Sequence, residues 1–285
     1  MAPPIMPIFD FKQVDVFASE PLKGNPLAVV IGADGLDEAR MAAFARWTNL
    51  SETIFLLRPT APQADYRVRI FTPGGELPFA GHPTLGACAV WLAGGGRPRG
   101  DTIVQECPVG LITLRRDGSR VAFAAPPLAR SGPVEAELWP CIAAGLGLAI
   151  GEIRAAQWVD NGPGWLAVLL DTRRRVLELR PDAAILSDLK VGVVAPWDPA
   201  VDGTQAQFEV RAFVPGLGIP EDPVTGSLNA GVAQWLMGCG RAPESYVAAQ
   251  GTALGRAGRV HVRKSGEDIW VGGEVVTCIE GRVTL

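Results

Sequence analysis

His82 is the side chain best suited to chemistry in this sequence, because it is one of only two histidines in 285 residues. It stands in the stretch Gly81-His82-Pro83-Thr84, directly before an apolar run that is typical of a helix. A proline is tolerated at the first helical position, since the N–H that it lacks would be unpaired there. The pattern predicts that a helix begins at Pro83 with His82 as its N-cap, and that His82 can take or give a proton beyond the helix end.

Glu52 lies at the polar start of an otherwise apolar stretch that ends at Leu57. A carboxylate there is either an exposed charge at a strand end or a desolvated group with a raised pKa, which suits general acid–base chemistry. Position alone leaves both interpretations open. Ser51 precedes Glu52 and is expected to cap or orient it. Weaker candidates for the same chemistry are Glu76, Asp188 and Glu221.

A second helix start, Asp222-Pro223, is followed by Val224, Thr225, Gly226 and Ser227. Asp is among the best N-caps, so Asp222 has a plain structural role. Two such helix ends at one site would offer unpaired N–H groups and partial positive charge to an anion. The remaining groups at these ends are the glycines, which allow close backbone approach, and three hydroxyls: Gly81, Gly226, Thr84, Thr225 and Ser227. These features predict a small carboxylate ligand; the alternative is a pair of well-capped helices that bind nothing.

The second half of the sequence repeats the first. Residues 69–74 match residues 211–216, and each match precedes one of the two helix starts. Two further matching pairs precede these in the chain and keep the same order: 24–30 with 161–169, and 50–52 with 186–188. The repeat predicts an internal duplication of about 130 residues, and so two similar domains with a cleft between them. A linker is expected in the Pro- and Gly-rich stretch 126–133.

Composition excludes several classes of protein. Apolar residues at 48% and charged residues at 20% are typical of a globular chain, and a net charge of −4 without a basic run gives no footprint for nucleic acid. Five cysteines without a Cys-x-x-Cys pair, and two histidines, make a metal site unexpected. No glycine-rich nucleotide motif is present, and residues 1–4 carry no signal-peptide pattern. We therefore expect a cytoplasmic protein that has no membrane spans and keeps its thiols reduced. We also expect it to transfer protons without a cofactor.

Several stretches together resemble the PhzF-like (phenazine biosynthesis protein) family of the diaminopimelate-epimerase-like fold. They run in the family's order along nearly the whole chain: residues 14–17, 24–30, 49–53, 67–73, 76–84, 221–227, 250–251 and 255–256. The resemblance implies an α+β protein of two pseudo-symmetric domains, each a strongly curved, mostly antiparallel sheet wrapped around a central helix, with the active site in the cleft between them. The expected domains are 1–126, completed by a C-terminal strand near 268–285, and 127–267.

The resemblance further implies a cofactor-free isomerase that acts on a small carboxylate, dihydro-hydroxyanthranilate-like or amino-acid-like. Glu52 is similar to the family's general acid/base, and His82, Asp222 and Ser227 match its other catalytic residues. The substrate-binding positions are then Ser51, Gly81, Gly226, Thr84 and Thr225. Family members often pair, so a homodimer is expected. The sequence does not name the substrate, and two alternatives stay open: a non-catalytic carboxylate-binding or regulatory protein, and an amino-acid racemase or epimerase. His82 and Asp222, where related epimerases have cysteines, argue against a two-thiol racemase.

Overall fold

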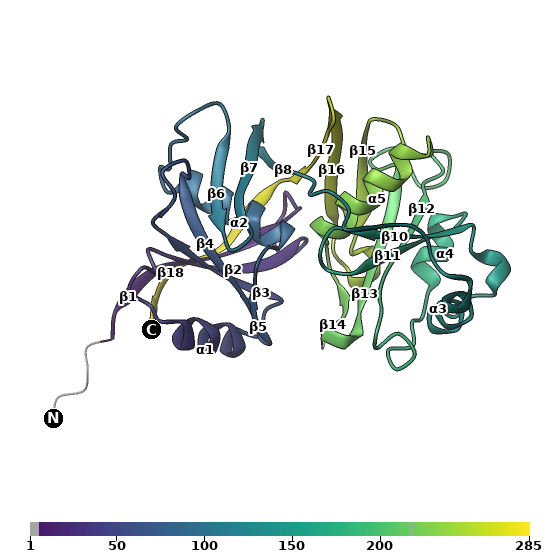
Figure 1. Cartoon of the computed structure of the whole chain (residues 1–285), viewed down its shortest axis with the longest axis horizontal. Helices are drawn as coiled ribbons and strands as arrows, with labels where there is room; N and C mark the ends of the chain where they lie inside the picture. Colours follow the sequence, from purple (N-terminus) through teal and green to yellow (C-terminus); the bar gives the residue numbers. More distant parts are fainter. Residues whose placement is uncertain (1–5, 218) are drawn as a thin grey trace. The chain divides into compact units, whose positions relative to one another are not determined.

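A computed structural model describes residues 6–217 and 219–285, so residues 1–4, where the sequence lacks a signal-peptide pattern, lie outside the described residues. The chain forms two compact units, Met1–Phe123 with Gly273–Leu285, and Ala124–Gly272. Each unit is a curved sheet with few helices (Figure 1). We describe the two units one after the other.

The first unit is built from nine strands and two helices. These are β1 (Ile8–Val16), β2 (Asn25–Ile31), α1 (Glu38–Thr48), β3 (Glu52–Leu57), β4 (Tyr66–Thr72), β5 (Gly75–Leu77), α2 (Gly81–Ala93), β6 (Ile103–Cys107), β7 (Gly110–Asp117), β8 (Arg120–Ala124) and β18 (Val275–Thr284). The antiparallel pairs are β1–β18, β1–β2, β3–β4, β4–β5, β6–β7 and β7–β8, and the parallel pairs are β2–β3 and β4–β6. The last strand of the chain therefore completes the sheet at its first strand.

Helix α2 is the centre of the first unit. Its residues are apolar or small almost all round, and such a helix is stable only when it is buried. It packs against β1, β2, β3, β4 and β18. Gly86 allows this close approach, because a Cβ atom added there would lie 2.4 Å from Cδ2 of Leu27. Helix α1 covers the sheet from its other side with Met41, Phe44 and Ala45, and its C-cap Asn49 has the left-handed conformation (φ 52°).

The second unit contains the remaining strands. Its elements are β9 (Arg130–Pro133), α3 (Trp139–Leu146), β10 (Ala155–Asp160), β11 (Trp165–Leu169), α4 (Arg173–Glu178), β12 (Lys190–Pro196), β13 (Phe208–Val214), β14 (Ile219–Asp222), α5 (Gly226–Gly238), β15 (Ser245–Gln250), β16 (Gly258–Ser265) and β17 (Asp268–Gly273). Short 3₁₀ turns lie at Ala136–Leu138, Ile150–Glu152, Pro215–Leu217 and Thr252–Leu254. The antiparallel pairs are β9–β10, β10–β11, β12–β13, β13–β14, β15–β16 and β16–β17, and the parallel pairs are β11–β12 and β13–β15.

The two units have the same topology. Strands β1 to β8 of the first unit correspond in order to β10 to β17 of the second, and every corresponding pair has the same orientation; β18 corresponds to β9. Helices α2 and α5 have 13 residues each and follow corresponding strands. The predicted fold, two pseudo-symmetric domains of curved, mostly antiparallel sheet around a central helix, is confirmed.

A repeated ion pair marks the duplication at the level of side chains. In β4, the Arg69 guanidinium donates from Nε and Nη2 to Glu76 at 2.7 and 2.6 Å. In β13, Arg211 donates from the same two atoms to Glu221 at 2.9 and 2.7 Å. Bidentate pairs of this kind fix a guanidinium in one orientation. The Arg at the start of each sequence repeat therefore holds the short strand that leads to each central helix.

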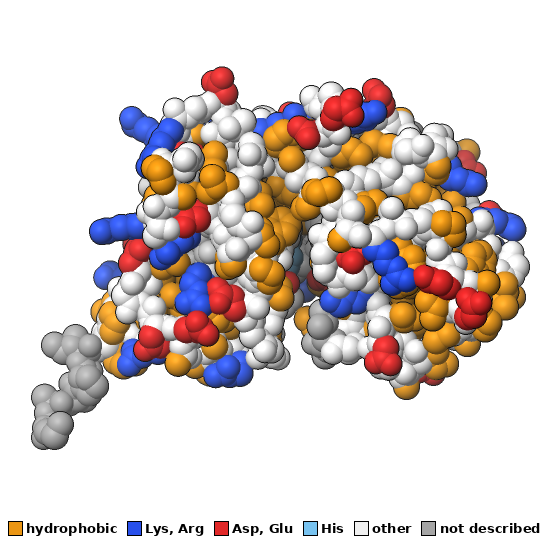
Figure 2. Space-filling model, viewed as in Figure 1, with side chains coloured by type: hydrophobic (Ala, Val, Ile, Leu, Met, Phe, Trp, Pro, Cys, Tyr) orange, Lys and Arg blue, Asp and Glu red, His pale blue; other side chains and the backbone are white. Residues whose placement is uncertain are grey.

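Figure 2 shows acidic and basic side chains interspersed on the face that it presents. No helix within residues 6–217 and 219–285 combines the length and the apolar character that a membrane span requires.

Candidate active site

The central helices begin at other residues than the sequence predicts. Helix α2 begins at Gly81 with Ala80 as its N-cap, so His82 is the second helical residue and Pro83 the third. The first intrahelical bond runs from Thr84 N to Ala80 O at 3.2 Å. Pro83 fits because the N–H groups of the first turn have no intrahelical acceptor. The prediction that His82 caps the helix was wrong, and the backbone of Ala80 takes that place.

His82 and Glu52 face each other inside the first unit. Glu52 begins β3, which pairs in parallel with β2, and His82 begins the helix packed on both strands. His82 Nε2 lies 3.3 Å from Glu52 Oε2, a close ion-pair distance without the angles of an aligned hydrogen bond. The His82 side chain is 5% exposed and that of Glu52 is 16% exposed. Strand pairing and helix packing thus bring together two of the predicted catalytic residues.

Two further side chains extend this pair. Asn25 Nδ2 lies 3.3 Å from His82 Nδ1, and Ser51 Oγ donates to Asn25 Oδ1 at 3.4 Å. Asn25 is the first residue of β2 and is fully buried. Sequence reasoning included Ser51 but assigned no role to Asn25, although residues 24–30 carried part of the family resemblance.

The surroundings of Glu52 set its protonation. Burial raises the pKa of Glu52 to about 7, and the hydrogen bond from Ser51 acts in the opposite direction. Of the two interpretations that the sequence leaves open, the structure therefore favours the desolvated carboxyl. A carboxyl with a pKa near 7 can both accept and donate a proton at neutral pH.

Asp222 does not cap its helix either, because it lies three residues before the N-cap of α5. It ends β14, and α5 begins later, at Gly226, with Thr225 as the N-cap. The Thr225 hydroxyl donates to Asp222 Oδ2 at 2.5 Å, so Asp222 holds the cap instead of capping the helix itself. The prediction of a helix start at Pro223 was wrong. The chain bends at Pro223 and Val224, and only Thr225 reaches the position of the N-cap.

Gln250 fixes this segment from β15 and was not assigned a role from the sequence. Its Oε1 accepts from Thr225 N at 3.0 Å and from Asn229 Nδ2 at 2.8 Å. Its Nε2 donates to Asp222 O at 3.1 Å and to Thr225 Oγ1 at 2.9 Å. The fully buried Gln250 thereby satisfies the polar groups that the late helix start leaves without intrahelical partners.

Ser227 is the structural counterpart of His82. Both occupy the second position of their helices, after Gly226 and Gly81. Ser227 Oγ accepts a hydrogen bond from Trp165 Nε1 at 3.0 Å, which leaves the serine hydrogen to be donated elsewhere. Matching the two halves of the sequence pairs His82 with Asp222. The observed helix starts show instead that His82 corresponds to Ser227.

The remaining predicted residues have mixed surroundings. Thr84 is fully buried, and its hydroxyl accepts from Gln105 Nε2 at 3.0 Å, while Gly81 and Gly226 are buried at the helix starts. Of the weaker candidates, Glu76 and Glu221 are held by Arg69 and Arg211, and Asp188 is exposed. In the first unit the structure brings together Glu52, Ser51 and His82. In the second unit it brings together Asp222, Thr225 and Ser227. The location of the site in a cleft between the domains stays a prediction.

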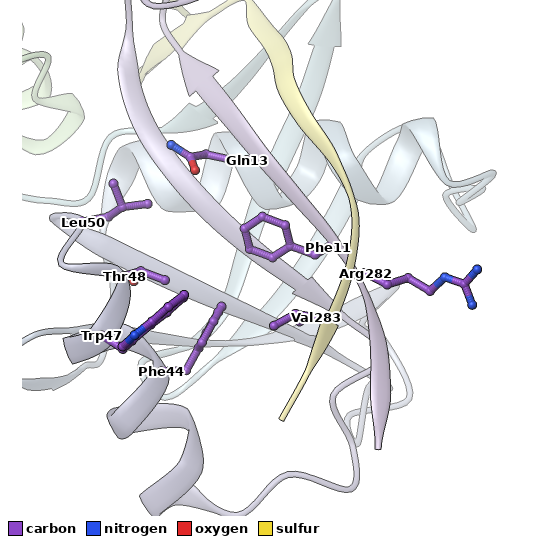
Figure 3. A pocket seen from close by; sticks show the side chains of 8 residues that line it. All are labelled: Phe11, Gln13, Phe44, Trp47, Thr48, Leu50, Arg282 and Val283. Atoms are coloured by element: carbon purple, nitrogen blue, oxygen red, sulfur yellow. The ribbon is translucent and has the colours of Figure 1, made fainter. Parts of the chain in front are cut away.

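The described residues contain no group of three or more histidine, cysteine, aspartate or glutamate side chains arranged to hold a metal ion. A separate groove of about 390 Å³ lies on the first unit, beside the end of α1. Figure 3 shows the aromatic side chains that line it and shows Arg282 turned away from it. The lining residues are Phe11, Gln13, Phe44, Trp47, Thr48, Leu50, Arg282 and Val283. None of the predicted site residues is among them.

The duplicated α+β fold, with a curved sheet around a central helix in each unit, agrees with the fold class that the sequence resemblance implies. The family model described as "Phenazine biosynthesis-like protein" (PhzC-PhzF) matches residues 14–281. The chain belongs to this family, as the sequence resemblance predicts.

Similar proteins agree with this assignment. A trans-2,3-dihydro-3-hydroxyanthranilate isomerase from Pseudomonas aeruginosa is 35% identical, over 94% of this chain and 92% of its own. Antisense-enhancing sequence 1 from Schizosaccharomyces pombe is 36% identical, over 95% of this chain and 97% of its own. The crystal structure of a PhzF-family phenazine biosynthesis protein from Enterococcus faecalis has a TM-score of 0.81 at 27% identity, covering 98% of this chain and 100% of that one. Several relatives are named isomerases, which confirms the prediction of an enzyme of that class.

Proposed function

We propose that this protein is a cofactor-independent isomerase that moves a proton between carbons of a small carboxylate, with Glu52 as general acid/base. The observation that carries the proposal is the buried Glu52 carboxyl, with a pKa of about 7, beside His82. Ionised Glu52 would accept a proton from a C–H bond, and the electron pair of that bond would shift into the adjacent unsaturated system. Protonated Glu52 would then return the proton at another carbon. The reaction conserves all atoms and electrons and needs no oxidant.

The start of helix α5 in the second unit has groups that suit a carboxylate. Helix α5 offers the N–H groups of its first turn and the Ser227 hydroxyl, and buried Gly226 exposes no side chain there. Asp222 and Thr225 would orient polar groups of the substrate, and Gly81 and Thr84 would serve at the start of α2. The name of the Pseudomonas aeruginosa relative supports a dihydro-hydroxyanthranilate-like substrate, and an amino-acid-like one is the alternative. We further propose that the enzyme acts as a cytoplasmic homodimer.

The proposal is tested by screening small carboxylates for thermal stabilisation and then for hydrogen exchange. Each carboxylate that raises the melting temperature is incubated with the enzyme in heavy water and analysed for carbon-bound deuterium. If the protein is an isomerase, at least one ligand should take up deuterium and give a product with the same molecular formula apart from the exchanged hydrogen. Stabilisation by several carboxylates without any exchange would contradict the proposal and favour a binding or regulatory protein. A racemase would instead exchange hydrogen and invert the configuration of a single enantiomer, which polarimetry would detect as a loss of optical rotation.

A further inference from the structure

Strand pairing and burial fix the position of Asn25. It pairs with Val16 of β1 as the first residue of β2, and its side chain is fully buried. The preceding Gly24 donates from its N–H to Asp15 Oδ2 at 3.3 Å. A Cβ atom on Gly24 would lie 2.4 Å from Val16 O, so the chain enters β2 by a close approach that requires glycine. The Asn25 amide is therefore aimed at its neighbours by the backbone.

The two ends of this amide have different partners. Its Oδ1 accepts from Ser51 Oγ at 3.4 Å, and its Nδ2 faces His82 Nδ1 at 3.3 Å. An amide nitrogen can only donate, so His82 Nδ1 must be the acceptor and carry no proton. In neutral imidazole the proton then resides on Nε2, which is the nitrogen that faces Glu52 Oε2 at 3.3 Å. One side chain thus determines that the His82 nitrogen facing the carboxyl is the protonated one.

The second unit repeats this arrangement with other residue types. Trp165 is the first residue of β11, the strand that corresponds to β2, and its indole N–H donates to Ser227 Oγ at 3.0 Å. Ser227 has the same position in α5 that His82 has in α2. In both units an N–H from the start of this strand is directed at the second residue of the central helix. The duplication has kept the contact although both partners differ.

We propose that Asn25 is a positioning residue that holds His82 as the neutral Nε2–H tautomer facing Glu52. The inference rests on the proposed function, in which Glu52 transfers the proton beside His82. With Nδ1 occupied by the Asn25 donor, a doubly protonated His82 would set two N–H groups against each other. His82 therefore keeps its Nε2–H on the side of Glu52 while the carboxyl takes up and releases the proton. Glu52, and not His82, is left as the group that changes charge.

Nitrogen-15 NMR of the histidine side chains tests this tautomer without any substrate. The chain has only His82 and His261, so the variant His261→Gln assigns the two rings by difference. In the wild-type protein we expect a non-protonated signal for His82 Nδ1 and a protonated signal for Nε2, at pH values on both sides of 7. A protonated Nδ1 in the wild type would overturn the proposal by itself, whatever any variant does.

The variant Asn25→Asp reverses the polarity of the contact at nearly constant volume. A carboxylate accepts where the amide donated, so the Nδ1 signal of His82 should become that of a protonated nitrogen. Asn49→Asp is the matched control, since it makes the same atomic change at an exposed position three residues before Glu52. It should leave both His82 signals as in the wild type. An unchanged Nδ1 in folded Asn25→Asp, with melting followed in parallel, would refute the positioning role.

The two proposals fail separately. If no carboxylate exchanges hydrogen but the wild-type tautomer and its reversal are observed, the isomerase is wrong and the role of Asn25 stands. If exchange is found, Asn25→Asp should lower its kcat at least tenfold with a smaller change in KM. Exchange that is unaffected by a reversed tautomer would remove Asn25 from the reaction.

Discussion

Replacing Glu52 by Gln should change how the stability of the protein depends on pH. The pKa of Glu52 rises from 4.5 to about 7 on burial. Between these values the folded state binds more protons than the unfolded state, so its stability must fall as the pH rises through this range. At about 1.4 kcal/mol per pH unit, the loss amounts to about 3 kcal/mol and is complete above pH 7. Glu52→Gln removes this loss because its amide does not ionise.

Urea unfolding at a series of pH values between about 4.5 and 8 measures the effect. The difference in free energy of unfolding, Glu52→Gln minus wild type, should grow by about 3 kcal/mol across this window. The carboxyls whose pKa is lowered by hydrogen bonds and neighbouring arginines, such as Glu152 and Asp171, lose their contribution only at lower pH. Glu20→Gln, at an exposed position of the same unit, is the control and should give a constant difference. A constant difference for Glu52→Gln as well would refute the reasoning from burial.

Two further predictions concern the central helices. Gly86→Ala and Gly231→Ala each gain helix propensity, but the Cβ would lie 2.4 Å from a movable methyl of Leu27 in the first and 2.2 Å from the carbonyl oxygen of Val159 in the second. Gly231→Ala should therefore destabilise by about 1–3 kcal/mol and Gly86→Ala by less, as read from urea midpoints; equal costs would contradict the contact geometry. Trp165→Phe keeps only the benzene part of the indole and removes the N–H donor to Ser227, so the lost hydrogen bond should cost about 1 kcal/mol besides the lost ring packing, and thermal stabilisation by carboxylates should fall. Undiminished stabilisation would show that carboxylate binding does not need the hydrogen bond from Trp165 to Ser227.

The sequence predicts the duplication correctly because short stretches of the first half recur in the second half. Arg69 and Arg211 stand in matching stretches, and both form the same bidentate pair with a glutamate of the following short strand. The apolar run after Pro83 likewise predicts a helix, and α2 is found there. Such features depend on neighbours close in the chain, which a single sequence displays.

Contacts between distant residues escaped the sequence. Asn25 meets His82 across 57 residues, and Gln250 meets Thr225 from another strand, so no local pattern reveals either contact. The helix starts were misplaced for a related reason. A proline is compatible with any of the first helical positions, and only the hydrogen bond of Thr84 N to Ala80 O shows which one Pro83 occupies. The pKa of Glu52 also required the structure, since its burial arises from packing and not from residue type.

Deuterium incorporation by wild type and Glu52→Gln tests the central claim most directly. A carboxylate that exchanges with the wild-type enzyme is incubated in heavy water with each variant, and Glu20→Gln serves as the control. If Glu52 carries the proton, Glu52→Gln should lose at least a hundredfold in exchange rate, in line with the usual contribution of a general acid or base of about 10²–10⁴. The wild-type rate should also change near pH 7, where Glu52 titrates. Equal incorporation by wild type and Glu52→Gln would contradict the claim.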